Sequence, residues 1–312
     1  MGNSVTLYYG KVNLNSSHIF EVYDEKLNIT DVLKKLYRSI QDNIKHTRID
    51  MVDDIETYRA TYIFDDIEKD IETMSIYGKV IKKSNLYANQ RDEQNRPIKV
   101  AVPNEECIQF YFDVMKEAMV FYTTQRFGYN DFIYAMQMLL SESINKMYGS
   151  DEEYYNFDVS LKRSNLSMDT LKEELKELKN IESLRIDIIP PNPDDEILEE
   201  NKRNGEKKLD DLKEGNVTYK STFLQSKSST GIVLDSSIVE EEIDSAIHMH
   251  SKISDDKTLD NGYVQVEATS KDWYTYSTKD RQPIKSTIEK ECLDDKELFK
   301  KSIRHSIKIV FE

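Results

Sequence analysis

The stretch that decides the fold runs from Glu153 to Lys213 and opens with EYYNFDVSLKRSNLS at residues 153–167. Apolar and polar residues alternate from Tyr155 to Lys162, which is the period of a half-buried strand. Three leucines then recur at helical spacing and form one apolar stripe: Leu171, Leu175 and Leu178. The pattern predicts a strand followed by an amphipathic helix.

A second alternation, Leu184–Ile188, predicts another strand, which Pro190 and Pro191 end because proline cannot donate to a ladder. A further helix is predicted to begin at Asn192, a good capping residue, and to end near Lys213. A strand, a helix and a strand in this order fit either a right-handed parallel crossover or half of a ferredoxin-like unit.

The rest of the chain predicts mainly antiparallel pairing. We expect hairpins over Ile108–Tyr122 and Tyr263–Tyr276, a polar loop at Tyr87–Arg96 and a closing strand at Ile307–Phe311. One helix is expected to begin near Thr30 and to hold Lys45 and His46 in its last turn. A second is expected to begin near Asn130 with an apolar face from Phe132 to Met147, and a third after a capping box that Ser237 opens. The predicted class is α+β (or α/β), with mixed, largely antiparallel sheets and packed helices. Since no spacer rich in Gly, Pro or Ser interrupts the chain, we expect two closely packed lobes, residues 1–150 and 151–312.

Charge and composition limit the class of partner. The formal charge is −15, and most of it lies after residue 150. A general phosphate-binding surface needs Lys and Arg in excess, so the acidity disfavours nucleic acid as a partner. No apolar run is long enough to span a membrane. Cys107 and Cys292 have no neighbours at metal-ligand spacing and are expected to be reduced and buried, which fits a cytoplasmic protein.

Few residues suggest chemistry. His248 and His250 are the one local pair of good metal ligands, but on a helix their side chains would diverge by about 200°. Glu267 and Lys271 near a strand end could serve a metal-dependent nuclease, in which carboxylates hold Mg²⁺ and a lysine assists the attacking water. Their spacing differs from the usual nuclease pattern. No nucleotide-binding or hydrolase motif is present, so no cofactor is predicted outside the nuclease alternative.

Two segments carry a resemblance: Leu175–Asp195 and Asn261–Glu267, the latter followed by Ser277–Asp280. They resemble uncharacterised bacterial proteins found in phage-defence or mobile-element gene neighbourhoods. The resemblance implies a cytoplasmic accessory or effector role and supplies no catalytic residue. We therefore expect a non-catalytic interaction or accessory subunit of an anti-phage defence or phage-related system, acting on a protein partner or as a homo-oligomer. The alternatives are a diverged metal-dependent nuclease effector and a small-molecule or nucleotide sensor.

Overall fold

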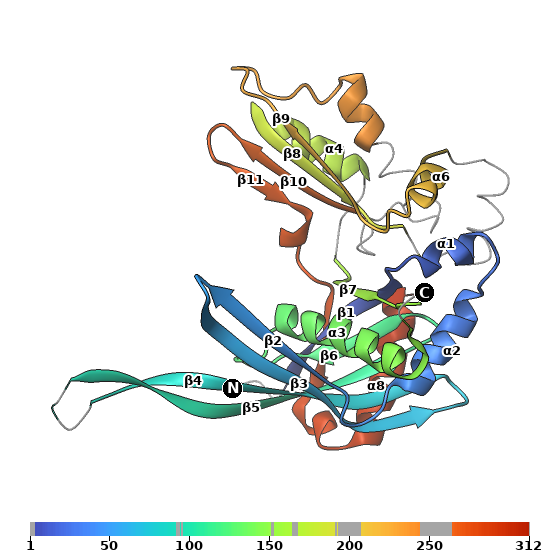
Figure 1. Cartoon of the computed structure of the whole chain (residues 1–312), viewed down its shortest axis with the longest axis vertical. Helices are drawn as coiled ribbons and strands as arrows, with labels where there is room; N and C mark the ends of the chain where they lie inside the picture. The colour runs from blue at the N-terminus through green and yellow to red at the C-terminus, as the bar shows by residue number, and fades with distance from the viewer. Residues whose placement is uncertain are drawn as a thin grey trace. The chain divides into compact units, whose positions relative to one another are not determined.

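The computed structural model describes residues 4–91, 94, 96–150, 153–163, 168–190, 192, 207–243 and 264–311 (Figure 1). The chain divides into two compact units, each made of separate segments. Unit 1 holds residues 1–8, 33–152 and 285–312, and unit 2 holds residues 9–32 and 153–284. The sequence placed one boundary after residue 150; the units change at Glu152, but each also includes a segment from the other side of that point. The crossings after residues 8, 32 and 284 were not predicted, because no linker composition marks them.

The predicted α+β class is confirmed, since helices accompany two sheets that are mostly antiparallel. The larger sheet has the order β12-β1-β6-β5-β4-β3-β2. Its strands are β1 (Ser4–Leu14), β2 (Lys45–Val52), β3 (Ile55–Asp70), β4 (Ser75–Arg91), β5 (Pro97–Asp113), β6 (Ala118–Tyr122) and β12 (Lys285–Glu289).

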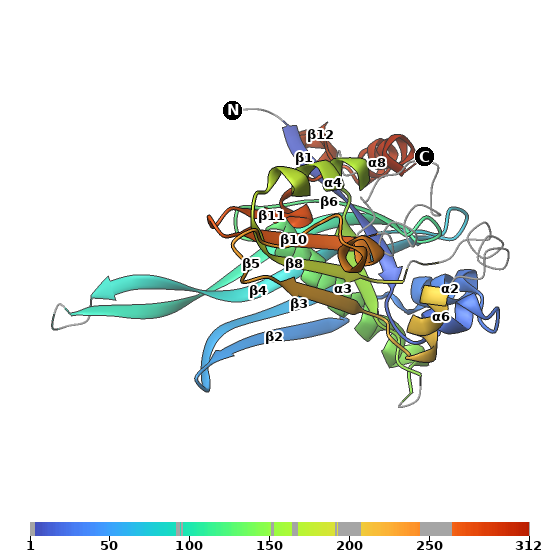
Figure 2. The ribbon, with the colours of Figure 1, turned by 90° about the horizontal axis from the view of Figure 1, so that it is seen from above.

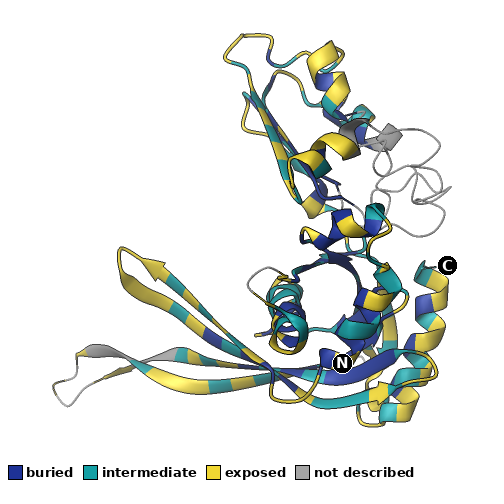
Figure 3. Cartoon of the chain, turned by 45° about the vertical axis from the view of Figure 1, so that its right-hand side comes forward, coloured by how far each residue is buried: buried dark blue, intermediate teal, exposed yellow. Residues whose placement is uncertain are grey.

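Helix α3 (Tyr129–Tyr148) supplies the core of unit 1, and the sheet curls around it (Figure 3). Its apolar face was predicted correctly: Phe132, Met136 and Leu139 are fully buried. Phe132 stacks on Phe121 of β6 with ring centroids 4.0 Å apart. Aromatic residues at these positions are therefore core residues, as the helical spacing indicated.

The end of the chain differs from the prediction. Ile307–Phe311 is not a strand, because helix α8 runs from Lys296 to Phe311. Phe299, Ile303 and Ile307 lie four residues apart on one side of this helix and are almost completely buried. The dense β-branched residues suggested a strand, but the four-residue spacing of the buried side chains begins upstream of them.

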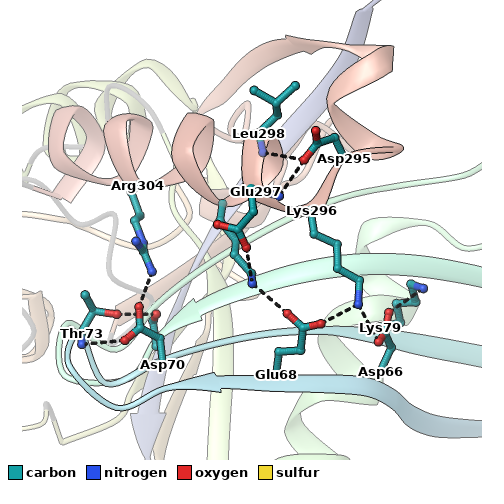
Figure 4. Close-up of polar contacts among 12 residues, drawn as sticks. Asp66, Glu68, Asp70, Thr73, Lys79, Asp295, Lys296, Glu297, Leu298 and Arg304 are labelled. Carbon is teal, nitrogen blue, oxygen red and sulfur yellow. Dashed lines mark hydrogen bonds and ion pairs between the residues drawn. The ribbon is translucent and has the colours of Figure 1, made fainter.

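A row of ion pairs also attaches α8 to β3 (Figure 4). Lys296 contacts Asp66 at 2.8 Å and Glu68 at 2.6 Å, Lys300 contacts Glu68 at 2.8 Å, and Arg304 contacts Asp70 at 2.6 Å. Four residues of helix rise about 6 Å and two residues of strand rise about 6.6 Å. The basic row on α8 and the acidic row on β3 therefore have nearly the same spacing and remain opposite each other. These acids, which could have suggested a metal site, are neutralised by α8.

Helix α2 (Ile29–Ser39) ends earlier than predicted. The backbone N–H of Thr30, in the first turn, donates a hydrogen bond to the side-chain oxygen of Asn28 at 2.7 Å. Asn28 rather than Thr30 therefore caps the helix. Lys45 and His46, expected in its last turn, begin β2. Asn43, with φ of 64°, lies in the turn between α2 and β2.

Unit 2 separates the two strands of the Glu153–Lys213 stretch. Strand β7 (Phe157–Leu161) pairs with the far half of β1, whereas β8 (Ile181–Ile188) lies in a four-stranded sheet of order β11-β10-β8-β9. The strands and the helix between them were predicted correctly, but neither the parallel crossover nor the ferredoxin-like half is formed. Pairing partners far away in sequence decided this, and periodicity carries no information about them.

The remaining elements of unit 2 complete this smaller sheet. The predicted hairpin after residue 263 is confirmed. A helix does form at residues 237–243, but it already includes Ser237, which the sequence predicted as its cap. Of the helix predicted from Asn192 to Lys213, residues 193–206 lie outside the described ranges and the last turns form α6, while the side chain of Asn192 accepts a hydrogen bond from the backbone N–H of Leu14 at 2.9 Å. The elements are α1 (His18–Tyr23), α4 (Met168–Glu177), α6 (Lys207–Glu214), β9 (Lys220–Gln225), β10 (Val264–Ser270), β11 (Thr275–Ser277) and the 3₁₀ turn η1 (Thr278–Asp280); a second such turn, η2 (Lys290–Leu293), precedes α8 in unit 1.

Candidate functional site

The larger sheet forks at one end. Strands β3 and β4 pair from Asp70 and Ser75 up to Ala60 and Ser84, where their ladder stops. Beyond this point β3 continues only with β2, and β4 continues only with β5, as two separate ribbons that splay apart (Figures 1 and 2). We call Ile49–Arg59 the short arm and Asn85–Pro103 the long arm.

The short arm ends in a tight turn and an apolar tip. Asp53 and Asp54 both have positive φ, 49° and 62°, as a two-residue type I′ hairpin turn requires. Four large apolar side chains around this turn are between 45% and 67% exposed: Ile49, Met51, Val52 and Ile55. Exposed apolar residues gathered at one place are typical of an interaction surface.

The long arm is an unbroken continuation of the β4–β5 hairpin. The two strands keep one register from Ser75 opposite Asp113 to Arg91 opposite Pro97. The part beyond the fork spans about seven residues, or roughly 23 Å at the rise of a strand. Figure 3 shows much of its described surface as exposed, and Val102 is 41% exposed on the face that Leu86 shares. The sequence predicted a polar loop at Tyr87–Arg96, whereas β4 runs on to Arg91.

An ion pair between a buried lysine and a partly exposed aspartate lies at the root of the fork. Lys82 of β4 is 6% exposed, pairs with Asp131 of α3 and donates to the carbonyl of Arg126 at 3.0 Å. The Tyr62 hydroxyl donates to the other oxygen of Asp131 at 3.1 Å. Burial alone would lower the pKa of Lys82, but the hydrogen bond and charge of Asp131 outweigh it and hold this pKa above its usual value. Lys82 is therefore charged and cannot serve as a general base.

Arg48 covers this pair from the short-arm side. Its guanidinium donates two hydrogen bonds to Asp50, at 2.9 and 2.8 Å, which together with the charge of Asp50 raise its pKa. It also lies 4.9 Å from the ring centre of Tyr134 and 5.4 Å from that of Tyr58. Each charged group in this cluster has a partner, so the geometry supports a fixed root for the two arms and not an acid–base reaction.

The two predicted nuclease residues contact different partners. Glu267, on β10, lies 3.3 Å from Lys279, and Lys271 donates to the carbonyl of Lys227 at 3.3 Å. Within the described part of the chain, no group of three His, Cys, Asp or Glu side chains could hold a metal ion. His248 and His250 lie outside the described residues.

Unit 2 contains a hollow of about 650 Å³ that the sequence did not reveal. Its wall includes Tyr274 and Tyr276 of the β10–β11 hairpin and Arg281, which pairs with Glu174 of α4. The Tyr276 hydroxyl is buried and has no hydrogen-bond partner among the described residues, and burial raises the pKa of Tyr276 to about 12. The volume is that of a small-molecule site.

Residues 26–303 match a family model described as Domain of unknown function (DUF4747). The chain belongs to this family. The match includes both arms, their root and the hollow of unit 2, so these features lie within the family's domain. No curated protein matches the chain. Membership of the DUF4747 family therefore assigns no activity, and function has to be argued from the chain's own geometry.

None of the helices in the described ranges is long and apolar enough to cross a membrane. Both cysteines are free, but Cys107 is exposed and Cys292 is half-buried, so the expectation of buried thiols was wrong.

The long arm could have been found in the sequence, because the alternations Leu86–Gln90 and Ile98–Val102 mirror each other across residues 91–97.

Proposed function

We propose that the chain is a non-catalytic interaction subunit that binds a protein partner through the fork of unit 1. The apolar tip of the short arm carries this proposal. Met51, Val52 and Ile55 are each more than half exposed at the end of a hairpin, where they contribute little to the core of their own chain. Covering such side chains with a partner removes apolar surface from water, which is the main driving force of association.

The root of the fork supports the same function. A buried lysine, an aspartate and a stacked arginine hold the bases of both arms, so the arms start from a preorganised frame. Preorganisation reduces the entropy lost on binding. A cytoplasmic role in an anti-phage defence or phage-related system belongs to this proposal as well. It rests on the two quoted segments, and the genes beside this one would test it directly.

The test is affinity purification of the tagged chain from its native host, with quantitative mass spectrometry. Met51→Ser/Ile55→Ser should lose the co-purifying partner, because both side chains face solvent and their replacement leaves the fold intact. Ile71→Ser is the matched control, since Ile71 is 78% exposed and lies outside the fork. Wild type with no partner, or a double variant that retains the wild-type partner, would contradict the proposal.

One observation favours a second candidate function, the small-molecule or nucleotide sensor. The hollow of unit 2 has the volume of a ligand site and holds an unpartnered tyrosine hydroxyl. A thermal-shift screen of nucleotides and metabolites would test it, with Tyr276→Phe as the variant that should weaken any hit. The nuclease alternative finds no cluster of metal ligands in the described part of the chain, and incubation of DNA and RNA with Mg²⁺ or Mn²⁺ would test it.

A further inference from the structure

The two edges of the long arm differ in chemistry. On β5, Pro97 and Pro103 remove backbone donors, which is a common way of blocking a sheet edge against pairing. On β4, residues 85–90 read NLYANQ and contain neither proline nor lysine. In the described ranges, no strand pairs with this side of β4 beyond Ser84. One edge of the arm is thus blocked, and the edge that faces the fork is open.

The ladder shows which backbone groups lie on the open edge. Phe64 of β3 exchanges hydrogen bonds with Asn43 and Ile44, on the β2 side, so its neighbours Ile63 and Thr61 direct theirs toward β4. Their register partners on β4 are the odd-numbered residues 81 and 83. Since direction alternates along a strand, Asn85, Tyr87 and Asn89 direct their N–H and C=O groups into the fork.

The positions of the two prolines on β5 independently indicate the same orientation of the β4 backbone. Pro103 stands directly opposite Asn85, and Pro97 stands opposite Arg91. A proline has no N–H to give to β4, so these are the pairs of the ladder that exchange no hydrogen bonds. Odd-numbered residues of β4 therefore point away from β5, toward the fork.

An isolated two-stranded ribbon is only marginally stable in water, so the long arm needs further strands. The charge of the arm permits a second copy of the chain to supply them. The whole chain carries −15, which opposes self-association, but residues 83–106 are neutral. They hold four basic and four acidic residues: Lys83, Arg91, Arg96, Lys99, Asp92, Glu93, Glu105 and Glu106.

We propose that the open edge of β4 pairs antiparallel with the same edge of a second copy, which makes a homodimer. An antiparallel pair of identical strands is related by a two-fold axis, so the contact closes at two copies. Odd-numbered residues of β4 in one copy lie opposite odd-numbered residues of β4 in the other. The backbone N–H and C=O groups of Asn85, Tyr87 and Asn89 then form hydrogen bonds with the second copy. The result is one four-stranded sheet, β5-β4-β4-β5, with both outer edges blocked by proline.

The inference deepens the proposed function, because it names a second copy as one occupant of the fork. The first measurement is molar mass by light scattering and sedimentation at micromolar concentrations. Wild type should be a dimer. Tyr87→Pro removes a backbone donor from the open edge and should give a monomer, whereas Tyr87→Thr keeps that donor and should remain dimeric.

Ala101→Pro is the matched control on the other edge. Ala101 lies directly opposite Tyr87, so its replacement removes a donor from the edge that is already blocked, and the dimer should persist. If Tyr87→Pro fails to fold, a trimmed chain replaces it. Leu86 and Val102 are opposite each other, so Asn-Gly can join them as a two-residue turn. The trimmed chain should be folded and monomeric.

Disulfide formation tests the geometry of the pairing. In a Cys107→Ser/Cys292→Ser background, single cysteines at positions 86, 87 and 88 surround the expected two-fold axis. At least one should form a disulfide between copies, because opposite residues of paired strands lie about 5 Å apart. Cysteines at positions 100, 101 and 102 should form none, since the two β5 strands are three strand spacings, roughly 14 Å, apart.

Three outcomes would overturn the dimer: a monomeric wild type, a dimeric Tyr87→Pro or trimmed chain, or equal cross-linking from β4 and β5. These outcomes are separable from failure of the proposed function. A monomer that captures a partner through Met51 and Ile55 would overturn the dimer and leave the interaction subunit standing. A dimer with no further partner would support this inference and count against the short-arm interface.

Discussion

Helix α8 allows a direct comparison between an apolar contact and an ion pair on one element. Phe299 is fully buried and meets the ring of Tyr77 edge-on, with centroids 5.8 Å apart. Replacing it by alanine should destabilise the attachment of α8 by about 3–5 kcal/mol, from lost burial and the cavity left behind. Lys300 lies beside it on the helix, and its ammonium contacts Glu68 and Glu297 at 2.8 and 3.0 Å.

Lys300→Met should cost much less. The Lys300 side chain is 17% exposed, but the carboxylates that it contacts are 43% and 83% exposed, so water screens both pairs. Pairs of this kind contribute about 0.5–1 kcal/mol, and methionine keeps the apolar stem of the lysine packed. The difference from Phe299→Ala is at least about 2 kcal/mol, or roughly 30-fold in the equilibrium for opening α8.

Hydrogen exchange with mass spectrometry on peptides covering residues 296–311 measures this opening without unfolding the rest of the chain. Phe299→Ala should exchange far faster than Lys300→Met, and Lys301→Met, on the exposed side of α8, should match wild type. Equal acceleration by Phe299→Ala and Lys300→Met would refute the reasoning. It would mean that the ion-pair row, and not the buried row, holds the helix.

Three further predictions concern other parts of the chain. Lys82→Met leaves Asp131 without its buried cation and should cost about 3 kcal/mol in urea unfolding, and adding Asp131→Leu should recover part of the loss. Gly231→Ala should destabilise unit 2 by about 2 kcal/mol in thermal melts, because φ is +75° and a Cβ would lie 2.6 Å from the backbone of Asn180; unchanged stability would contradict this. Hydrogen bonds from the lysines of α8 hold the pKa of Glu68 below 4.5, so its contribution is present above about pH 4.5 and is lost as the pH falls through the lowered pKa. Glu68→Gln should therefore melt below wild type at neutral pH, and the difference should shrink as the pH falls below about 4.5.

The sequence by itself determined the class of the fold and most of its elements. Alternation identified β7 and β8, a leucine stripe identified α4, and the apolar face from Phe132 to Ile144 identified α3. These signals succeed because helix and strand periods are set by a few neighbouring residues. The same local patterns contain no strong catalytic motif, and in the structure Glu267 and Lys271 contact different partners.

Only the tertiary structure decided which elements meet. Ile307–Phe311 became helical because Phe299, Ile303 and Ile307 share one buried side against the sheet, and β7 and β8 entered different sheets because their partners lie far away in the chain. The fork exists because the β3–β4 ladder stops at Ala60 and Ser84, although both strands continue. Strand pairing is a contact between distant residues, and each strand's own sequence specifies its period but not its neighbour.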